Sequence, residues 1–241
     1  MTSISTSTSS SPLEGVISPL AISSAPVLSE SYPRSLPFPH GVVTSICHPE
    51  FLIDVLEELK HNSRVKFKES DLFRVYQSVD LMNLRPGTDD SIRMPMLSRL
   101  RGALYSAEFR SYVERIANLD VGTLTERVDC AANCHAKGCH LLCHVDAIGT
   151  RAVSFILYLT DPEPVWGEED GGHLELYDSV TIDDDGDVAA EVGADENGSE
   201  RGGKGEGRRR RDPLPFPCKT ILPSSIPWPT SPWNRDGPSI Q

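Results

Sequence analysis

The stretch Leu141-Leu142-Cys143-His144-Val145-Asp146 carries more information about fold and chemistry than any other part of this 241-residue sequence. Its apolar start predicts a short β-strand, and residues two apart on a strand point to the same face. His144 and Asp146 are therefore expected to project together, while Cys143 and Val145 turn to the other side. Imidazole plus carboxylate is the paired part of the 2-His-1-carboxylate triad, which holds Fe(II) and leaves coordination positions open.

Two further strands are expected after this stretch. Residues 151–160 (RAVSFILYLT) form the strongest strand candidate in the chain, because they are rich in β-branched and aromatic residues. The four residues before them, 147–150, are short enough to form a hairpin loop. Residues 172–178 (GHLELYD) alternate apolar and polar side chains, as a half-buried strand does. Tyr158 places a polar ring near the end of the first of these strands.

The first half of the chain is expected to be mainly helical. Apolar residues recur at helical spacing over residues 49–61 and again over 96–117. Ser106 is expected to cap a second helix within the latter segment, with Glu108 in its first turn. Residues 66–84 have a mixed pattern. The residues expected to enter the core from that segment are Leu72, Phe73, Val75 and Tyr76.

Composition divides the chain into four segments. Residues 1–35 are rich in Ser, Thr and Pro and are predicted to be disordered. Residues 36–180 hold helices first and strands later, which predicts an α+β domain with a β-sandwich or double-stranded β-helix (jelly-roll) core. Residues 181–212 form a low-complexity charged insert, acidic first and then basic. Residues 213–241 form a Pro-rich tail, too short to supply several strands.

The charge and the apolar content exclude some classes of partner. A net charge of -12 argues against a general nucleic-acid binder, which needs a basic face. No apolar run is long enough to cross a bilayer, and residues 1–30 resemble neither a secretory signal nor an Arg-rich transit peptide. We therefore expect a cytoplasmic or nuclear protein whose six cysteines are reduced. Arg208 to Arg211 form a solvated charge run or, alternatively, a nuclear-import patch.

A zinc site is an alternative to the iron site, because thiolates and imidazoles are the preferred ligands of zinc. The cysteines and histidines that crowd into one short stretch are Cys130, Cys134, His135, Cys139, His140, Cys143 and His144. They contain no C-x2-C pair, and the chain has no second ligand cluster. Motifs of other enzymes are also missing, including a G-x-S-x-G elbow, a P-loop and a G-x-G-x-x-G turn.

Several segments resemble the Fe(II)- and 2-oxoglutarate-dependent prolyl hydroxylases of the ribosomal type, which are related to the fungal termination-and-polyadenylation protein and to the oxygen-sensing hydroxylases. The similar segments are PFPH (37–40), DLFRVYQSVDL (71–81), FRSYVERIANLD (109–120), LLCHVDAIGTRAVSFILYL (141–159) and EDGGHLELYD (169–178). They cover roughly residues 36–180 in the order of the family's N-terminal catalytic domain, and the segment with the His-x-Asp is the most specific.

The resemblance implies a double-stranded β-helix that binds Fe(II) and 2-oxoglutarate, with ascorbate as a further candidate cofactor. It implies hydroxylation of a prolyl residue in a protein, in this family a small-subunit ribosomal protein, with succinate and CO₂ as co-products. His144 and Asp146 match the first two iron ligands, and Tyr158 matches a tyrosine that contacts the cosubstrate. His135 stands where the family usually has another tyrosine.

The resemblance also implies a second histidine ligand and an arginine that binds the distal carboxylate of the cosubstrate. The only histidine after Asp146 is His173, which does not match the ligand position. Residues 219–223 (KTILP) and 233–235 (WNR) resemble the segment that enters the next core strand, and the likeness stops there. We therefore expect a C-terminally truncated chain or a misread gene model. A non-catalytic interaction module is the alternative.

Overall fold

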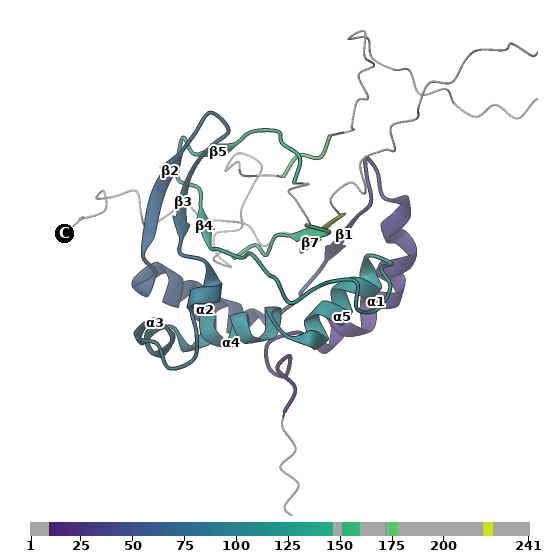
Figure 1. The fold of residues 1–241 in the computed structure, drawn as a ribbon, viewed down its shortest axis with the longest axis horizontal. Helices are drawn as coiled ribbons and strands as arrows, with labels where there is room; N and C mark the ends of the chain where they lie inside the picture. Colours follow the sequence, from purple (N-terminus) through teal and green to yellow (C-terminus); the bar gives the residue numbers. More distant parts are fainter. Residues whose placement is uncertain (1–9, 147–150, 160–171, 173, 178–218, 224–241) are drawn as a thin grey trace, which may run out of the picture.

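The computed structural model describes residues 10–146, 151–159, 172, 174–177 and 219–223. A layer of helices runs along one side of the molecule, and two small β-sheets stand against this layer (Figure 1). The described residues therefore combine helices with an antiparallel and a parallel sheet, which agrees with the α+β class expected from the sequence. In the part of the chain that the structure describes, no helix is both long and apolar enough to cross a membrane.

The helical segments expected from apolar spacing are confirmed. The α-helices are α1 (Pro19–Ser31), α2 (Pro49–Asn62), α3 (Asp89–Arg93), α4 (Pro95–Leu104) and α5 (Ala107–Ile116), with 3-10 turns η1 (Tyr32–Arg34) and η2 (Leu81–Asn83). The expected cap is also confirmed, because the Ser106 hydroxyl accepts a hydrogen bond from the Phe109 amide at 3.1 Å. This hydroxyl satisfies one of the amides that the first turn of a helix leaves unpaired.

Helix α4 receives its cap from another helix. The residue before it, Met94, offers no capping side chain. Instead, the two carboxylate oxygens of Glu58 on α2 accept hydrogen bonds from the amides of Met96 and Leu97, at 2.9 and 2.8 Å. A carboxylate at this end also complements the positive pole of the helix dipole. Glu58 thus fixes α4 against α2 by a charged contact that no local sequence pattern reveals.

Helix α1 corrects the prediction that residues 1–35 are disordered. Ser18 caps this helix by accepting from the Leu20 amide, and Pro19 occupies the first helical position. Ala21 and Ala25 are fully buried, and Tyr32 at the end of the helix is 1% exposed. Small side chains allow α1 to approach α5 closely, so a Ser/Ala-rich segment of low hydrophobicity still enters the core. Residues 1–9 lie outside the described part.

The antiparallel sheet joins β2 (Val65–Glu69) to β3 (Phe73–Ser78), and β3 to the short strands β4 (Asn133–Cys134) and β5 (His140–Leu141). β4 and β5 lie along the same edge of β3. Cys134 pairs with Tyr76 and His140 pairs with Arg74, so five residues, 135–139, stand opposite the single residue Val75. This looped-out segment is a large bulge between two short ladders.

The second sheet is parallel and has the order β1 (His40–Val43), β7 (Lys219–Pro223), β6 (Val153–Phe155). β7 pairs with β1 on one side and with β6 on the other, so residues far apart in the sequence meet in this sheet. β7 coincides with residues 219–223, the segment that resembles the entry to the family's next core strand.

Three strand predictions are corrected. The strand expected over 151–160 is assigned only over Val153–Phe155. The strand expected over 141–146 ends at Leu141. The described residues of 172–178 form no strand. Each of these segments has the right composition, but a strand also needs a neighbouring backbone to pair with along its whole length.

The hydrophobic core lies between the helices and the inner face of β6. Its buried apolar residues run from Val16 to Ala117, and Val153, Phe155, Leu157 and Leu159 pack against it from the strand side. Of the residues expected to enter the core from the first hairpin, Val75 is buried and Phe73 and Tyr76 are half-buried. Leu72 is exposed.

Candidate metal pair at His144 and Asp146

The segment that carries the candidate site leaves the sheet directly before it. Leu141 pairs with Phe73, and the Leu142 amide donates to the Leu72 carbonyl oxygen at 2.9 Å, which is the last bond of this ladder. His144 and Asp146 therefore do not lie on a regular strand, contrary to the sequence prediction. Their side chains nevertheless meet, as the two-residue spacing predicts: Nε2 of His144 lies 2.9 Å from Oδ1 of Asp146.

The imidazole of His144 is held by two oxygens. Nδ1 lies 2.8 Å from the Leu142 carbonyl oxygen, which can only accept, so Nδ1 donates the proton of this contact. The lone pair of a neutral ring is then on Nε2 and faces the Asp146 carboxylate. Such a contact is favourable when a second proton or a metal cation is shared by the two atoms.

The donor set suits Fe(II). Two neighbouring ligands, each about 2.1 Å from an octahedral ion, stand about 3.0 Å apart, which is close to the observed nitrogen–oxygen distance. An Nδ1–H bonded to a backbone carbonyl is the usual outer contact of a metal-ligating histidine. The side chains of His144 and Asp146 are 30% and 37% exposed, so an ion and small molecules can reach them. The pair supplies two of the three protein donors of a facial triad.

The third donor is not found among the described residues. Within residues 10–146, 151–159 and the shorter described pieces, no three His, Cys, Asp or Glu side chains gather closely enough to hold a metal ion. His173 lies outside the described residues. The same observation applies to the zinc alternative, because the expected cluster from Cys130 to His144 does not converge on one point in the described part of the chain.

The cysteines of that cluster have separate environments instead. Burial, followed by the charges of Asp80 and Asp129, raises the pKa of Cys130 to about 11. Burial and then the neighbouring Cys139 raise the pKa of Cys134. The pKa of His135 is lowered, first by burial and then by His140. In the absence of metal, these shifts keep the thiols of Cys130 and Cys134 protonated at neutral pH.

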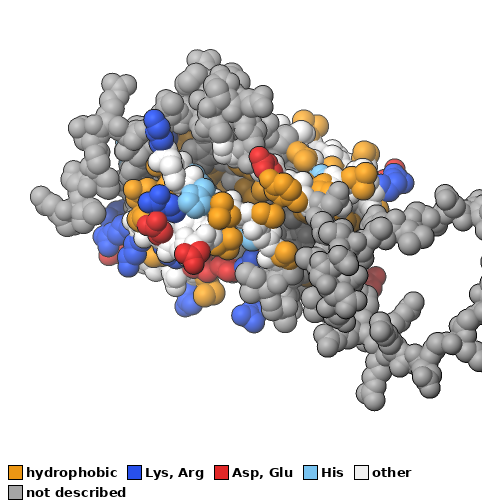
Figure 2. Space-filling model, turned by 90° about the horizontal axis from the view of Figure 1, so that it is seen from above, with side chains coloured by type: hydrophobic (Ala, Val, Ile, Leu, Met, Phe, Trp, Pro, Cys, Tyr) orange, Lys and Arg blue, Asp and Glu red, His pale blue; other side chains and the backbone are white. Residues whose placement is uncertain are grey.

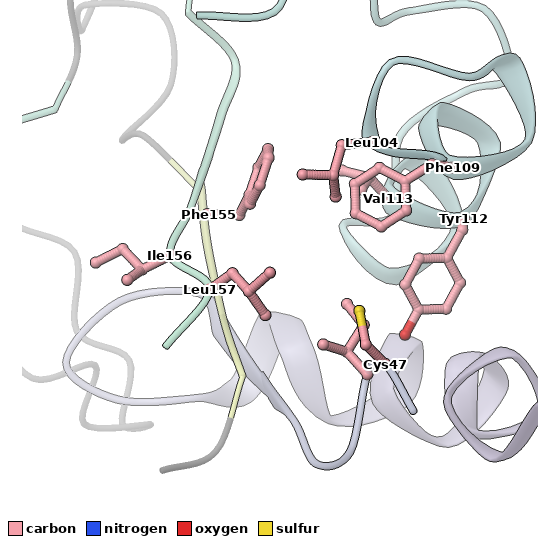
Figure 3. Close-up of a pocket in the computed structure, with 9 residues that line it drawn as sticks. Cys47, Leu104, Phe109, Tyr112, Val113, Phe155, Ile156 and Leu157 are labelled. Carbon is pink, nitrogen blue, oxygen red and sulfur yellow. The ribbon is translucent and has the colours of Figure 1, made fainter. Parts of the chain in front are cut away.

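Tyr158 lies on the face of its segment that points away from the helices. Phe155 and Leu157 point toward α5, while Ile156, between them, points the opposite way (Figure 3). Because alternate residues of an extended segment share a face, Tyr158 lies on the side of Ile156. Tyr158 is half-buried, and this burial raises the pKa of its phenol. None of the described contacts joins Tyr158 to His144 or Asp146.

A small apolar cavity lies on the helix side of the same segment, and sequence patterns did not point to it. Its volume is about 20 Å³, and Phe155, Leu157, Cys47 and Tyr112 are among its lining residues (Figure 3). The Tyr112 hydroxyl points toward Cys47 and has no hydrogen-bond partner in the described part of the chain. Burial raises the pKa of both groups to about 12. This cavity is a packing defect of the core and not part of the candidate site.

Exposed apolar residues surround the candidate pair. Leu141, Leu142 and Val145 are 51%, 52% and 74% exposed. The view from above shows hydrophobic side chains gathered near the middle of the visible face, beside charged side chains (Figure 2). A polar donor pair within an apolar surface is the arrangement that binding sites for small molecules and peptides commonly have.

Known proteins are similar in sequence to the part of the chain that contains this pair. Residues 130–192 match the 2OG-Fe(II) oxygenase superfamily. The chain is 45% identical over 144 residues to the prolyl 3,4-dihydroxylase OGFOD1 of Ostreococcus tauri, covering 59% of this chain and 28% of the relative. It is 34% identical over 152 residues to the prolyl 3-hydroxylase OGFOD1 of Xenopus laevis, covering 63% and 26%.

A third relative, the prolyl 3-hydroxylase OGFOD1 of Mus musculus, is 29% identical over 143 residues, which are 59% of this chain and 24% of the relative. The chain thus spans about a quarter of the length of the curated relatives it matches. Both His144 and Asp146 lie inside the matched superfamily segment. Residues 130–192 therefore resemble the 2OG-Fe(II) oxygenase superfamily, and more than half of the chain is similar to proteins named as OGFOD1 prolyl hydroxylases.

Proposed function

We propose that this protein is an Fe(II)- and 2-oxoglutarate-dependent dioxygenase that hydroxylates a prolyl residue of a protein substrate. The observation that carries the proposal is the pair formed by His144 Nε2 and Asp146 Oδ1 at 2.9 Å, inside the segment that matches the superfamily. The names of the relatives, prolyl 3,4-dihydroxylase and prolyl 3-hydroxylase, support a prolyl substrate with C3 as a hydroxylated position. A small-subunit ribosomal protein is the substrate that we propose.

In this proposal His144 and Asp146 hold Fe(II) through one nitrogen and one oxygen. Iron, when bound with 2-oxoglutarate, supplies the activation of O₂ that inserts one oxygen atom into a C–H bond. The Leu142 carbonyl oxygen holds the imidazole so that Nε2 stays directed at the site. Asp146 supplies negative charge that favours a divalent cation over a proton at this position.

Tyr158 is the proposed contact of the cosubstrate. Burial raises its phenol pKa, so at neutral pH the hydroxyl keeps its proton and donates a hydrogen bond to a carboxylate. This role requires the segment after β6 to turn its outer face toward His144. Such a placement is that of a closed double-stranded β-helix, which we propose as the complete core. The resemblance also calls for a second histidine and an arginine, and the described residues supply neither at this site.

The domain organisation follows from this proposal. The catalytic unit is proposed to extend over residues 36–180, with α1 as an added part of its helical layer and β7 as the next core strand. Residues 181–212 are proposed as an insert. The five described cysteines are free thiols, which supports a cytoplasmic or nuclear location.

Anaerobic titration of the purified chain with Fe(II) and 2-oxoglutarate tests the proposal. We expect binding of one equivalent of iron, followed by binding of 2-oxoglutarate. Asp146→Ala and His144→Ala should each remove iron binding, and Tyr158→Phe should weaken 2-oxoglutarate binding without loss of iron. Cys143→Ser is the matched control, because Cys143 is adjacent to His144 but contributes no ligand. Iron binding that survives both ligand substitutions would contradict the proposed pair.

The prolyl substrate needs a separate measurement. Incubation with O₂, ascorbate and a proline-containing peptide from a small-subunit ribosomal protein should add one oxygen atom to the proline, as detected by mass spectrometry. Metal analysis of the same preparation distinguishes the zinc alternative: one equivalent of zinc that remains in His144→Ala would show that the cysteines bind metal independently of the proposed pair.

A further inference from the structure

The exposed face of β2 carries positive charge that the described residues do not neutralise. Lys66 and Lys68 lie two residues apart on this strand, so they project from the same face. Their cross-strand neighbours on β3 are Gln77 and Val75, and Gln77 in turn donates to Asn133 on β4 at 2.9 Å. We call the surface formed by Lys66, Lys68, Gln77 and Asn133 the basic face.

The nearby acidic residue of β2 lies on the opposite face of the sheet. Glu69 is paired there with Arg74, at 2.9 Å between Oε1 and Nε. Phe67 shares that face and packs against Tyr76 with ring centroids 5.1 Å apart. In the part of the chain that the structure describes, Lys68 bonds only the neutral Gln77, and no ion pair involves Lys66. The basic face is therefore open to an anionic group.

The edge of the sheet at this point is also open. Among the described strands, β2 pairs with β3 and with nothing on its other side. An unpaired edge strand offers backbone donors and acceptors to an added extended segment. Exposed basic side chains and free backbone groups together select a polypeptide that is both extended and acidic.

The chain itself contains a segment of this chemistry. Residues 183–191 (DDDGDVAAE) hold five carboxylates and no positive charge. The last described residue before them is Tyr177.

Residues 183–191 belong to the connection between Tyr177 and Lys219, and their carboxylates carry the charge opposite to that of Lys66 and Lys68. Charge complementarity thus favours the chain's own acidic run as the occupant of the basic face.

We propose that residues 183–191 dock on the basic face of β2, with carboxylates against Lys66 and Lys68. This contact divides the 41-residue connection, residues 178–218, that separates the described strand segments before and after it. A docked segment shortens the free loop that must close before β7 can pair between β1 and β6. The docking site is independent of the metal pair, so failure of the proposed dioxygenase function would leave it unchanged.

Carbodiimide cross-linking of the full chain, which joins carboxylates to lysine amines without a spacer, tests this proposal. We expect mass spectrometry to find cross-links from residues 183–191 to Lys66 or Lys68. They should disappear at 1 M salt, where the screening length falls to about 3 Å. The double substitution Lys66→Gln, Lys68→Gln should remove them, whereas Lys137→Gln, at an exposed lysine of the bulge, should leave them at their original yield.

A second measurement keeps the proposal falsifiable if cross-linking is inefficient. Replacing Asp183, Asp184, Asp185 and Asp187 with Asn should speed hydrogen exchange of the β2 amides severalfold and leave exchange in α4 unchanged. Cross-links of the acidic run that go only to Lys204, in its own basic half, would overturn the proposal. Unchanged β2 exchange in the Asn variant would also overturn it.

Discussion

The helical layer and the segment that carries the candidate site differ most in burial. Every fully buried apolar residue of the described chain lies between Val16 and Ala117. The described residues after Ala117 are exposed or half-buried, including those from Leu141 to Asp146. Apolar burial supplies most of the free energy of folding, at roughly 25 cal/mol per Å². Stability and candidate chemistry therefore reside in different regions of this molecule.

The site region is held by directional contacts instead of burial. The ladder between β5 and β3, the Leu142–Leu72 backbone bond and the His144–Leu142 contact fix the candidate pair. Such contacts orient the side chains but add little to the free energy of folding, because each replaces a hydrogen bond to water. Substitutions should therefore separate the two regions: changes in the helical layer should unfold the chain, and changes in the site should remove binding only.

Thiol reactivity should show the largest difference between the regions. Burial raises the pKa of Cys47 from 9.0 to about 12, so its thiolate at pH 8 is scarcer by about 10³-fold. A thiol reagent should label the exposed Cys143 rapidly and Cys47 only after unfolding. Equally fast labelling of Cys47 in the folded chain would contradict its burial.

The raised pKa of Cys47 also predicts how the free energy of unfolding depends on pH. The folded state holds the proton more tightly than the unfolded state, so this contribution to the free energy of unfolding is complete below pH 9. It is lost as the pH rises toward 12. Labelling kinetics across this range, followed by peptide mapping, measure both effects.

Truncation of a core residue should have the next largest effect. Ile116 on α5 is fully buried, and Ile116→Ala should lower the free energy of unfolding by about 2–5 kcal/mol through lost burial and a residual cavity. The matched control is Ile156→Ala, on the outer face beside Tyr158, where the side chain is 38% exposed. In urea unfolding, Ile156→Ala should lower the free energy of unfolding by less than about 1 kcal/mol. Equal costs would show that the two regions share one core.

Loss of the α5 cap should have a smaller effect. Ser106→Ala removes the acceptor of the Phe109 amide and should cost about 1 kcal/mol. Ser111→Ala, on the exposed side of the same helix, is the control for the change of residue type and should be neutral or slightly stabilising. A cost for Ser106→Ala no larger than for Ser111→Ala would mean that the cap contributes nothing.

The smallest expected effect on stability is at the candidate pair itself. Asp146→Ala should change the free energy of unfolding by no more than about 0.5 kcal/mol in metal-free buffer, because the residue is solvent-exposed. The same variant is expected to lose iron binding. A large loss of stability would instead identify the His144–Asp146 contact as structural and would weaken its assignment as a metal pair.

Local patterns predicted those features whose cause is local. Residues 49–61 and 96–117 carry their apolar residues at helical spacing, and Ser106 is a capping residue followed by Glu108, so these helices follow from the sequence. The encounter of His144 with Asp146 was predicted from their spacing. It occurs, although the strand that was expected to produce it ends at Leu141.

Other features depend on partners that lie far away in the sequence. Helix α1 has a weakly apolar composition and is buried because Ala21 and Ala25 allow close packing against α5. The cap of α4 comes from Glu58, 38 residues before Met96. The lengths of β5 and β6 are set by the strands available to pair with them, which no property of their own residues reveals.

The sequence by itself determined the helices within residues 49–61 and 96–117 and the contact between His144 and Asp146, because both depend on residues close together along the chain. Only the tertiary structure decided that α1 belongs to the core, that five residues bulge opposite Val75, and that Ile156 points away from the helices. The physical reason is the same in each case. Burial and strand pairing depend on two segments in contact, and the sequence of one segment does not reveal which other segment packs against it or pairs with it.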